Sequence, residues 1–303
     1  MKFIVSVSKL ENFIFFLKNL SCYHFSCQKA FNQQWLLETG KLTSKEKAVL
    51  KELRGLLKNT NHPKELLKKF KAKSLFKNRF ETIWQKERKI LERWKKVLKR
   101  ELNKRFFDQL LDELSVLYST HFKRPSVGIC LLLSAKDLLA GEVEDGRIAI
   151  KCSGLEINKK NLRKIESVIF HELVHANLEE EVKKLIRKYI RKRDLEEFKK
   201  TKIFRKIRSL SRILRELILS SFLPRGYLGE KYFSDNLRKS VNPSFLKEIK
   251  SNKNLSNLEV FIAYKLYPLA KKYIEEKRPI DFDFLEKIIS KWKEYEVSPL
   301  KSF

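Results

Sequence analysis

Two histidines four residues apart, with a glutamate directly after the first, are the part of this sequence best suited to chemistry. They are His171, Glu172 and His175, in the segment His-Glu-Leu-Val-His. On a helix, residues four apart share one face, so both imidazoles can point at one metal ion. Glu172 is rotated by about 100° and can reach a water molecule bound to that ion. The pattern therefore predicts a zinc site with a general base beside it.

The residues around this HExxH motif favour a buried helix. Five of them are uncharged in a chain that is 34% charged, namely Val168, Ile169, Leu173, Val174 and Ala176. A helix that carries an active site inside a folded protein requires such a set. The alternative is that both histidines only pack on an amphipathic helix, with Glu172 in solvent.

The segment Val168–Ala176 resembles the active-site helix of the zincin metallopeptidases, and a short strand before it is similar to their arrangement. The resemblance extends from about Ser126 to Glu230. It implies a zinc metallopeptidase that hydrolyses a peptide or protein substrate, with Zn²⁺ as cofactor and Glu172 as the catalytic base. The fold we expect is α+β and predominantly helical, with a zincin-like small sheet, the HExxH helix and long flanking helices.

Tetrahedral zinc needs a third protein ligand. Glu179 lies four residues beyond His175, but on one straight helix it would be about 12 Å along the axis from His171. One helix therefore cannot supply all three ligands. Since no histidine follows His175, a carboxylate must serve, which resembles the gluzincin arrangement.

Two glutamates on apolar helical segments are candidates for this ligand, Glu216 first and Glu259 second. Glu216 precedes Ser220 by four residues. This is similar to the Glu-xxx-(Asp/Ser) pattern of gluzincins, in which the later residue can support a metal-binding histidine. For either glutamate, the alternative is a carboxylate paired with a neighbouring arginine.

A tetrahedral oxyanion would need a further donor, and without a downstream histidine a tyrosine or arginine must provide it. The segment 224–229 breaks the chain after the Glu216 helix and could deliver Arg225 or Tyr227, although an ordinary interhelical turn is slightly favoured. The segment 147–152 is expected to be an edge strand that pairs with an extended peptide.

The rest of the chain reads as mainly helical, because it contains only 8 Gly and 7 Pro. Thr43 and Glu46 form a capping-box pattern that predicts a helix start. Residues 74 to 120 predict one long amphipathic helix or two in tandem, and strands are expected at 127–133 and 147–152. We expect four segments: an amino-terminal appendage at 1–40, a helical region at 41–123, a zincin-like catalytic core at 124–236 and a helical carboxy-terminal region at 237–303.

The charge of the chain is strongly positive. Lys and Arg total 67 against 37 Asp and Glu, a formal net charge of +30, which attracts polyanions without specificity. Because the cations are spread along the whole chain, a solvated surface is favoured over a dedicated nucleic-acid site. The alternative function is a basic nucleic-acid-binding or scaffold protein whose HExxH is inactive or accidental.

Four cysteines are too few for a disulfide framework and predict a reducing, cytoplasmic location. Cys22, His24 and Cys27 could suggest a metal knuckle, but no second ligand pair follows them. Charged residues interrupt the apolar amino-terminal stretch, so neither a signal peptide nor a transmembrane segment is expected.

Overall fold

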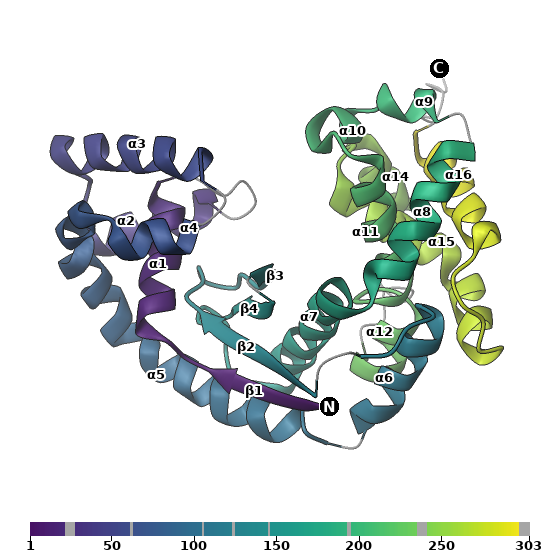
Figure 1. Cartoon of the computed structure of the whole chain (residues 1–303), viewed down its shortest axis with the longest axis horizontal. Coiled ribbons are helices and arrows are strands. Elements are labelled where there is room, and N and C mark those ends of the chain that lie inside the picture. Colours follow the sequence, from purple (N-terminus) through teal and green to yellow (C-terminus); the bar gives the residue numbers. More distant parts are fainter. Residues whose placement is uncertain are drawn as a thin grey trace. The chain divides into compact units, whose positions relative to one another are not determined.

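The computed structural model describes residues 1–21, 28–60, 63–104, 106–122, 125–144, 146–192, 195–234 and 241–296. The chain is α+β and predominantly helical, with one four-stranded mixed sheet, which confirms the expected class (Figure 1). The strands are β1 (Lys2–Ser6), β2 (Ser126–Leu132), β3 (Ala140–Glu144) and β4 (Arg147–Lys151). The helices are α1 (Lys9–Leu20), α2 (Gln28–Thr39), α3 (Ser44–Lys58), α4 (Pro63–Lys69), η1 (Lys71–Phe76), α5 (Lys77–Glu101), α6 (Phe106–Leu117), α7 (Lys159–Asn177), α8 (Glu179–Lys192), α9 (Glu196–Lys199), α10 (Lys202–Ile207), α11 (Leu210–Phe222), α12 (Tyr227–Phe233), α14 (Pro243–Ser251), α15 (Leu255–Glu275) and α16 (Phe282–Glu296).

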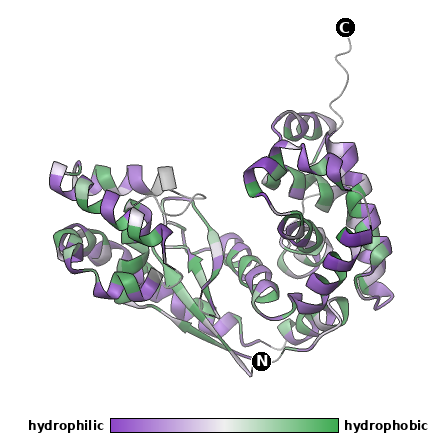
Figure 2. Ribbon diagram, turned by 45° about the horizontal axis from the view of Figure 1, so that its top comes forward, coloured by the Kyte–Doolittle hydropathy of each residue, from purple (hydrophilic) through white to green (hydrophobic). Residues whose placement is uncertain are grey.

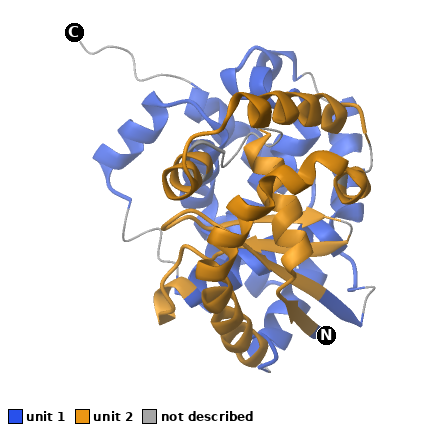
Figure 3. Ribbon diagram, turned by 90° about the vertical axis from the view of Figure 1, so that its left-hand side faces the viewer, with its two compact units in different colours: residues 1–2, 102–127, 162–303 blue, residues 3–101, 128–161 orange. Residues whose placement is uncertain are grey.

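The chain forms two compact units, and it crosses between them more than once (Figure 3). Unit 2 consists of residues 3–101 and 128–161, and it holds most of the sheet together with α1 to α5. Unit 1 consists of residues 1–2, 102–127 and 162–303, with α6, most of α7 and all later helices. The division therefore does not follow four consecutive segments.

The sheet has the strand order β1-β2-β4-β3, so β4 lies inside it. Ile150 of β4 is opposite Leu131 of the parallel strand β2 and opposite Gly141 of the antiparallel strand β3. The expectation that residues 147–152 form an edge strand is wrong. The reason is β3, whose sequence Ala-Gly-Glu-Val-Glu carries too few apolar residues to be recognised as a strand.

The described residues 3–21 and 28–40 contribute to unit 2 rather than forming an appendage. Within α1, the buried Asn12 side chain accepts a hydrogen bond from the Leu133 N–H (2.7 Å) and donates one to the Leu131 carbonyl (3.1 Å). Phe16 of α1 contacts the rings of Trp35 and Phe80, with centroids 5.1 and 5.8 Å apart. These contacts place the first two helices in the core of the unit.

The helices themselves form where the periodicity predicts them. The stretch from 74 to 120 forms two helices in tandem, α5 and α6. The capping box at the start of α3 is confirmed, with Thr43 and Glu46 each bonded to the backbone N–H of the other. Figure 2 shows hydrophilic and hydrophobic residues side by side along the helices, as amphipathic packing requires.

Two further expectations concern cysteines and membranes. Cys22, His24 and Cys27 lie outside the described residues, while Cys130 and Cys152 are buried free thiols. Among the described residues, no helix combines the length and the hydropathy that crossing a bilayer needs.

Arg79 at the start of α5 ties that helix to the α2–α3 connection. Its guanidinium donates to both carboxylate oxygens of Glu46 (2.5 and 2.9 Å) and to the backbone carbonyls of Thr39, Gly40 and Lys41 (2.7 to 2.9 Å). The Arg79 hydrogen bonds are the largest cause of a lowered pKa at Glu46 and outweigh the opposing effect of burial. A planar donor with several N–H groups is what this arrangement requires.

We expect Arg79→Lys to lower the free energy of unfolding by about 2 kcal/mol at pH 7, because an ammonium cannot make this set of bonds. Glu46 has a lowered pKa, so its contribution is present above the ordinary glutamate value of 4.5 and is lost as the pH falls through the folded pKa. The difference between the two proteins should therefore shrink in acid. Urea unfolding at several pH values measures it, and Arg88→Lys, at an exposed position of the same helix, should stay within about 0.5 kcal/mol of the original protein.

Candidate metal centre

Helix α7 carries the HExxH motif with one side in the core of unit 1. Ile165, Ile169 and Leu173, at helical spacing, are fully buried, whereas His171 and His175 are partly exposed. Next to the motif, the Phe170 ring packs against Phe107 of α6 and Phe233 of α12, with centroids 4.8 and 5.8 Å apart. These aromatic contacts fix the rotation of α7, because turning it would expose the rings. Glu172, the next residue, is partly exposed.

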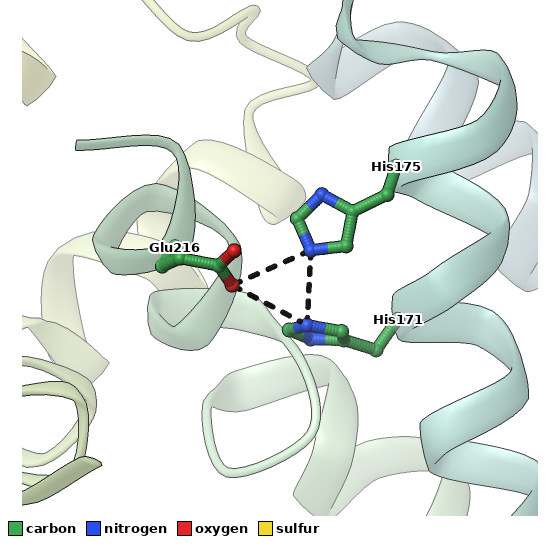
Figure 4. A group of neighbouring side chains, drawn as sticks. All are labelled: His171, His175 and Glu216. Carbon is green, nitrogen blue, oxygen red and sulfur yellow. Dashed lines mark hydrogen bonds and ion pairs between the residues drawn. The ribbon is translucent and has the colours of Figure 1, made fainter. Parts of the chain in front are cut away.

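The imidazole rings of His171 and His175 are nearly perpendicular, with centroids 4.7 Å apart, and a nitrogen of each ring faces the Glu216 carboxylate (Figure 4). Their Nε2 atoms are 3.1 Å apart, and Glu216 Oε2 lies 3.6 Å from His171 Nε2 and 3.4 Å from His175 Nε2. Three ligands around tetrahedral zinc, with bonds of about 2.0–2.1 Å, would be about 3.4 Å from one another. The donor set therefore fits such an ion in both chemistry and spacing. Of the described residues, these three form the one group of potential ligands whose donor atoms lie close enough together to hold a metal ion.

Glu216 reaches this position because of the burial pattern of α11. The apolar residues of that helix are buried, and α11 packs against α15 and α8. Burial alone would raise the pKa of the Glu216 carboxyl, but hydrogen bonds from His171 and His175 outweigh it and hold the pKa well below its ordinary value. Glu216 is thus an ionised ligand candidate that stands on a separate helix, as expected.

His175 has a second carboxylate on its other nitrogen. Its Nδ1 is hydrogen-bonded to Oε1 of Glu179, the first residue of α8, whose side chain is only 3% exposed. The other oxygen of Glu179 accepts a hydrogen bond from Arg215 Nη1 at 2.5 Å. Because Arg215 directly precedes Glu216, α8 and α11 are held together at the point where each supplies a site residue. A carboxylate on the outer nitrogen of a metal-binding histidine fixes the ring's orientation and raises its basicity.

The two carboxylates change the protonation of His175. Burial is the largest single influence and lowers its pKa, but hydrogen bonds to Glu179 and Glu216 together outweigh it and raise the pKa to about 10. The pKa of Glu179 is lowered in turn, although burial opposes this, by its bonds to His175 and Arg215. At neutral pH the group therefore holds an imidazolium between two carboxylates.

The second ring nitrogen of His171 contacts a backbone carbonyl. Its Nδ1 lies 3.4 Å from the carbonyl oxygen of Leu223, directly after α11. The turn from α11 into α12 is packed too closely for side chains at two positions. A Cβ at Gly226, just before α12, would lie 1.8 Å from the Ser221 carbonyl oxygen, and one at Gly229, inside α12, would lie 1.7 Å from that of Pro224. These glycines let the chain fold back on itself beside the Leu223 carbonyl.

Glu259, the second candidate for the third ligand, lies near the cluster but outside the ligand group. Burial, with a further contribution from the negative charge of Glu216, raises the pKa of Glu259 to about 7. Arg225 donates to the Ser256 carbonyl (3.4 Å) and the Tyr227 ring packs on Tyr267 (5.7 Å between centroids). Among the described contacts, neither Arg225 nor Tyr227 touches the three clustered residues, and their role as oxyanion donors stays a prediction.

Three features of the site escaped the sequence. Glu179 is rejected above as a ligand, although its spacing of four residues from His175, that of neighbours on one helix face, indicates the contact that the structure shows. Arg215 gave no signal because arginines are frequent in this chain. Tyr118, just after α6, is buried and lies within electrostatic reach of Glu179 and Glu216. Burial and these two charges raise its pKa well above the ordinary value. The expected partner role of Ser220 falls instead to Glu179.

Comparison of the chain with models of known protein families, with curated proteins and with solved structures finds no match. The geometry of the site is therefore the basis for inferring its function.

We expect Glu179→Gln to weaken zinc binding by about 10- to 100-fold, because an amide is a poorer partner for the His175 ring than a carboxylate. Competition with a chromophoric chelator measures the affinity. The matched control is Ser220→Ala, a change on the helix that carries Glu216, which should leave the affinity unchanged. An equal loss in both variants would contradict the assignment of Glu179 as the supporting residue.

Zinc binding should release at least one proton per chain at pH 7.5. A cation held by both Nε2 atoms requires neutral imidazoles, and His175, with its pKa of about 10, must give up its proton. Glu216 is already ionised and releases none. The apparent affinity should thus rise about tenfold per pH unit between pH 7 and 9, as judged by calorimetry in buffers of different ionisation enthalpy. Affinity that does not change over this range would contradict the protonated state of His175.

Proposed function

We propose that this chain is a zinc-dependent metallopeptidase, with His171, His175 and Glu216 as the metal ligands. The observation that carries the proposal is the mutual spacing of these three donor atoms, 3.1 to 3.6 Å, which suits a tetrahedral ion. Two nitrogen donors and one carboxylate are a ligand set typical of catalytic zinc. The choice of peptide bonds as substrate comes from the resemblance of the segment Val168–Ala176 to the zincins.

A bound zinc ion would supply Lewis acidity, lowering the pKa of a coordinated water toward about 7 and polarising the substrate carbonyl. Glu172 would take the proton from the attacking water and return it to the leaving amine. Its place directly after His171 on α7 lets it act without being a ligand. Glu179 would keep the His175 ring in one orientation, and the Leu223 carbonyl would do the same for His171.

Arg215 and Glu259 would set the charge around these ligands. Arg215 offsets part of the negative charge of Glu179. Glu259, with its pKa near 7, adds a group that titrates close to neutral pH within electrostatic range of Glu216 and His171. Ionisation of Glu259 would increase the negative charge around a bound cation.

The proposal is tested by separating metal binding from hydrolysis. Glu172→Gln should keep about one zinc per chain and lower the rate of hydrolysis by about 10²- to 10⁴-fold, because the general base is removed and the ligands are not. His171→Ala should lose both zinc and activity. Zinc is measured by elemental analysis, and hydrolysis by mass spectrometry of a peptide mixture and of unfolded casein.

Glu181→Gln, an exposed change on the neighbouring helix α8, is the matched control and should leave zinc content and hydrolysis unchanged. Loss of zinc in Glu172→Gln would make Glu172 structural. A wild-type protein that binds no zinc, or cleavage that persists equally in Glu172→Gln, would refute the proposed function.

A further inference from the structure

A broad groove of about 1020 Å³ runs along α5 in unit 2. It is lined on one side by α5 and on the other by Val7 and Lys9, where β1 leads into α1. None of the residues of the metal centre lines it, so a ligand of this groove would be independent of the proposed function.

The chemical character of this groove is set by four cations of α5, namely Arg88, Lys89, Arg93 and Lys96. All four side chains are exposed, and none forms an ion pair with any residue that the structure describes. They fall within a sector of about 140° of the helix and extend over about 12 Å of its axis. We call them the α5 cation row.

The acidic residues of the groove do not neutralise this row, because each is bound to another lysine. Glu81 pairs with Lys9 at 2.6 Å, and Glu92 pairs with Lys95 at 3.2 Å. The two carboxylates in the groove are therefore paired with lysines outside the α5 cation row. Like charges at this spacing repel one another, and a bound polyanion would relieve that repulsion.

We propose that the α5 cation row binds the phosphodiester backbone of a nucleic acid. Four cations can contact about four phosphates, and along one strand of a duplex a row of about 12 Å spans three to four nucleotides at 3.4 Å of helix axis each. The two arginines offer forked donors that suit phosphate oxygens, and the lysines supply point charges. Among the groove's residues, Gln85 is the one exposed neutral polar side chain and Trp84 is buried, so recognition follows the backbone and is tolerant of sequence.

Two other polyanionic partners fit the groove less well. A membrane surface would need apolar side chains next to the cations, but the apolar residues of α5, including Leu91, Trp94 and Leu98, are fully buried in unit 2. In an extended acidic peptide, successive side chains point to opposite faces, so carboxylates on one face are about 7 Å apart. Such a peptide therefore presents fewer negative charges to the row of cations than a duplex strand does. Tight binding of either partner would overturn the proposal.

The test compares two variants that remove the same charge from two helices of the same unit. The groove variant replaces the four residues of the α5 cation row with alanine. The control variant replaces four exposed cations of α3, which do not line the groove, with alanine, namely Lys47, Lys51, Arg54 and Lys58. Exposed alanines suit a helix, so both variants should fold, which circular dichroism and thermal unfolding check.

Binding is measured by fluorescence anisotropy with a labelled single-stranded 20-nucleotide DNA and with RNA of the same sequence, at several salt concentrations. The groove variant should bind at least about 10-fold more weakly at 100 mM salt, and the slope of log affinity against log salt should become shallower by about 3, since about 0.7 is expected per phosphate contact on a single strand. The control variant should change affinity less than about threefold. In a third protein, Arg88→Lys combined with Arg93→Lys should retain most of the binding, because the charge is kept.

Equal losses in the groove and control variants would mean that only the net charge matters, and would overturn the proposal. No loss in either variant would do the same. Parallel measurements use vesicles that contain phosphatidylserine and a 20-residue polyglutamate peptide. Binding of either as tight as that of the oligonucleotide, with the same dependence on the α5 cation row, would reassign the groove to that partner.

Discussion

The carboxylate of Glu179 is the contact on which the candidate site depends. One of its oxygens meets His175 and the other meets Arg215, so a single buried group joins α7, α8 and α11. A buried carboxylate is unfavourable unless its charge is compensated and its oxygens accept hydrogen bonds. Both conditions are met only when the HExxH helix and the helix of Glu216 adopt the observed arrangement. The arrangement of helices that orients the site residues is therefore also the arrangement in which the buried charge of Glu179 is compensated.

The sequence predicted the candidate ligands because their signal is local or nearly so. His171, Glu172 and His175 follow from helical periodicity, and Glu216 follows from a charged residue among apolar ones on a helix. What surrounds them depends on tertiary contacts. The spacing of four residues between His175 and Glu179 indicates their contact, but only the folded chain brings Arg215 and Tyr118 within reach of that carboxylate.

The same distinction explains the fold. Long helices such as α5, and the capped start of α3, were predictable because their apolar spacing and capping residues lie in one stretch of chain. The order of the strands was not, because β3 is short and partly acidic and gains its place from pairing with β4. The role of residues 1–40 was also hidden, since Asn12 and Phe16 have meaning only beside β2 and α5.

The crossing of the chain between the two units has a consequence for how the protein can form. Helix α6, which contributes Phe107 to the packing behind the HExxH helix, is made well before α7, and residues 128–161 of unit 2 intervene. During synthesis, α6 is complete before the helices that it packs against have been made. The contacts that complete unit 1 close long loops, which slows folding. A single cut in the backbone cannot release unit 1 as one piece. Isolating the half of the molecule that holds the metal ligands therefore requires a new linker that joins residue 127 directly to residue 162.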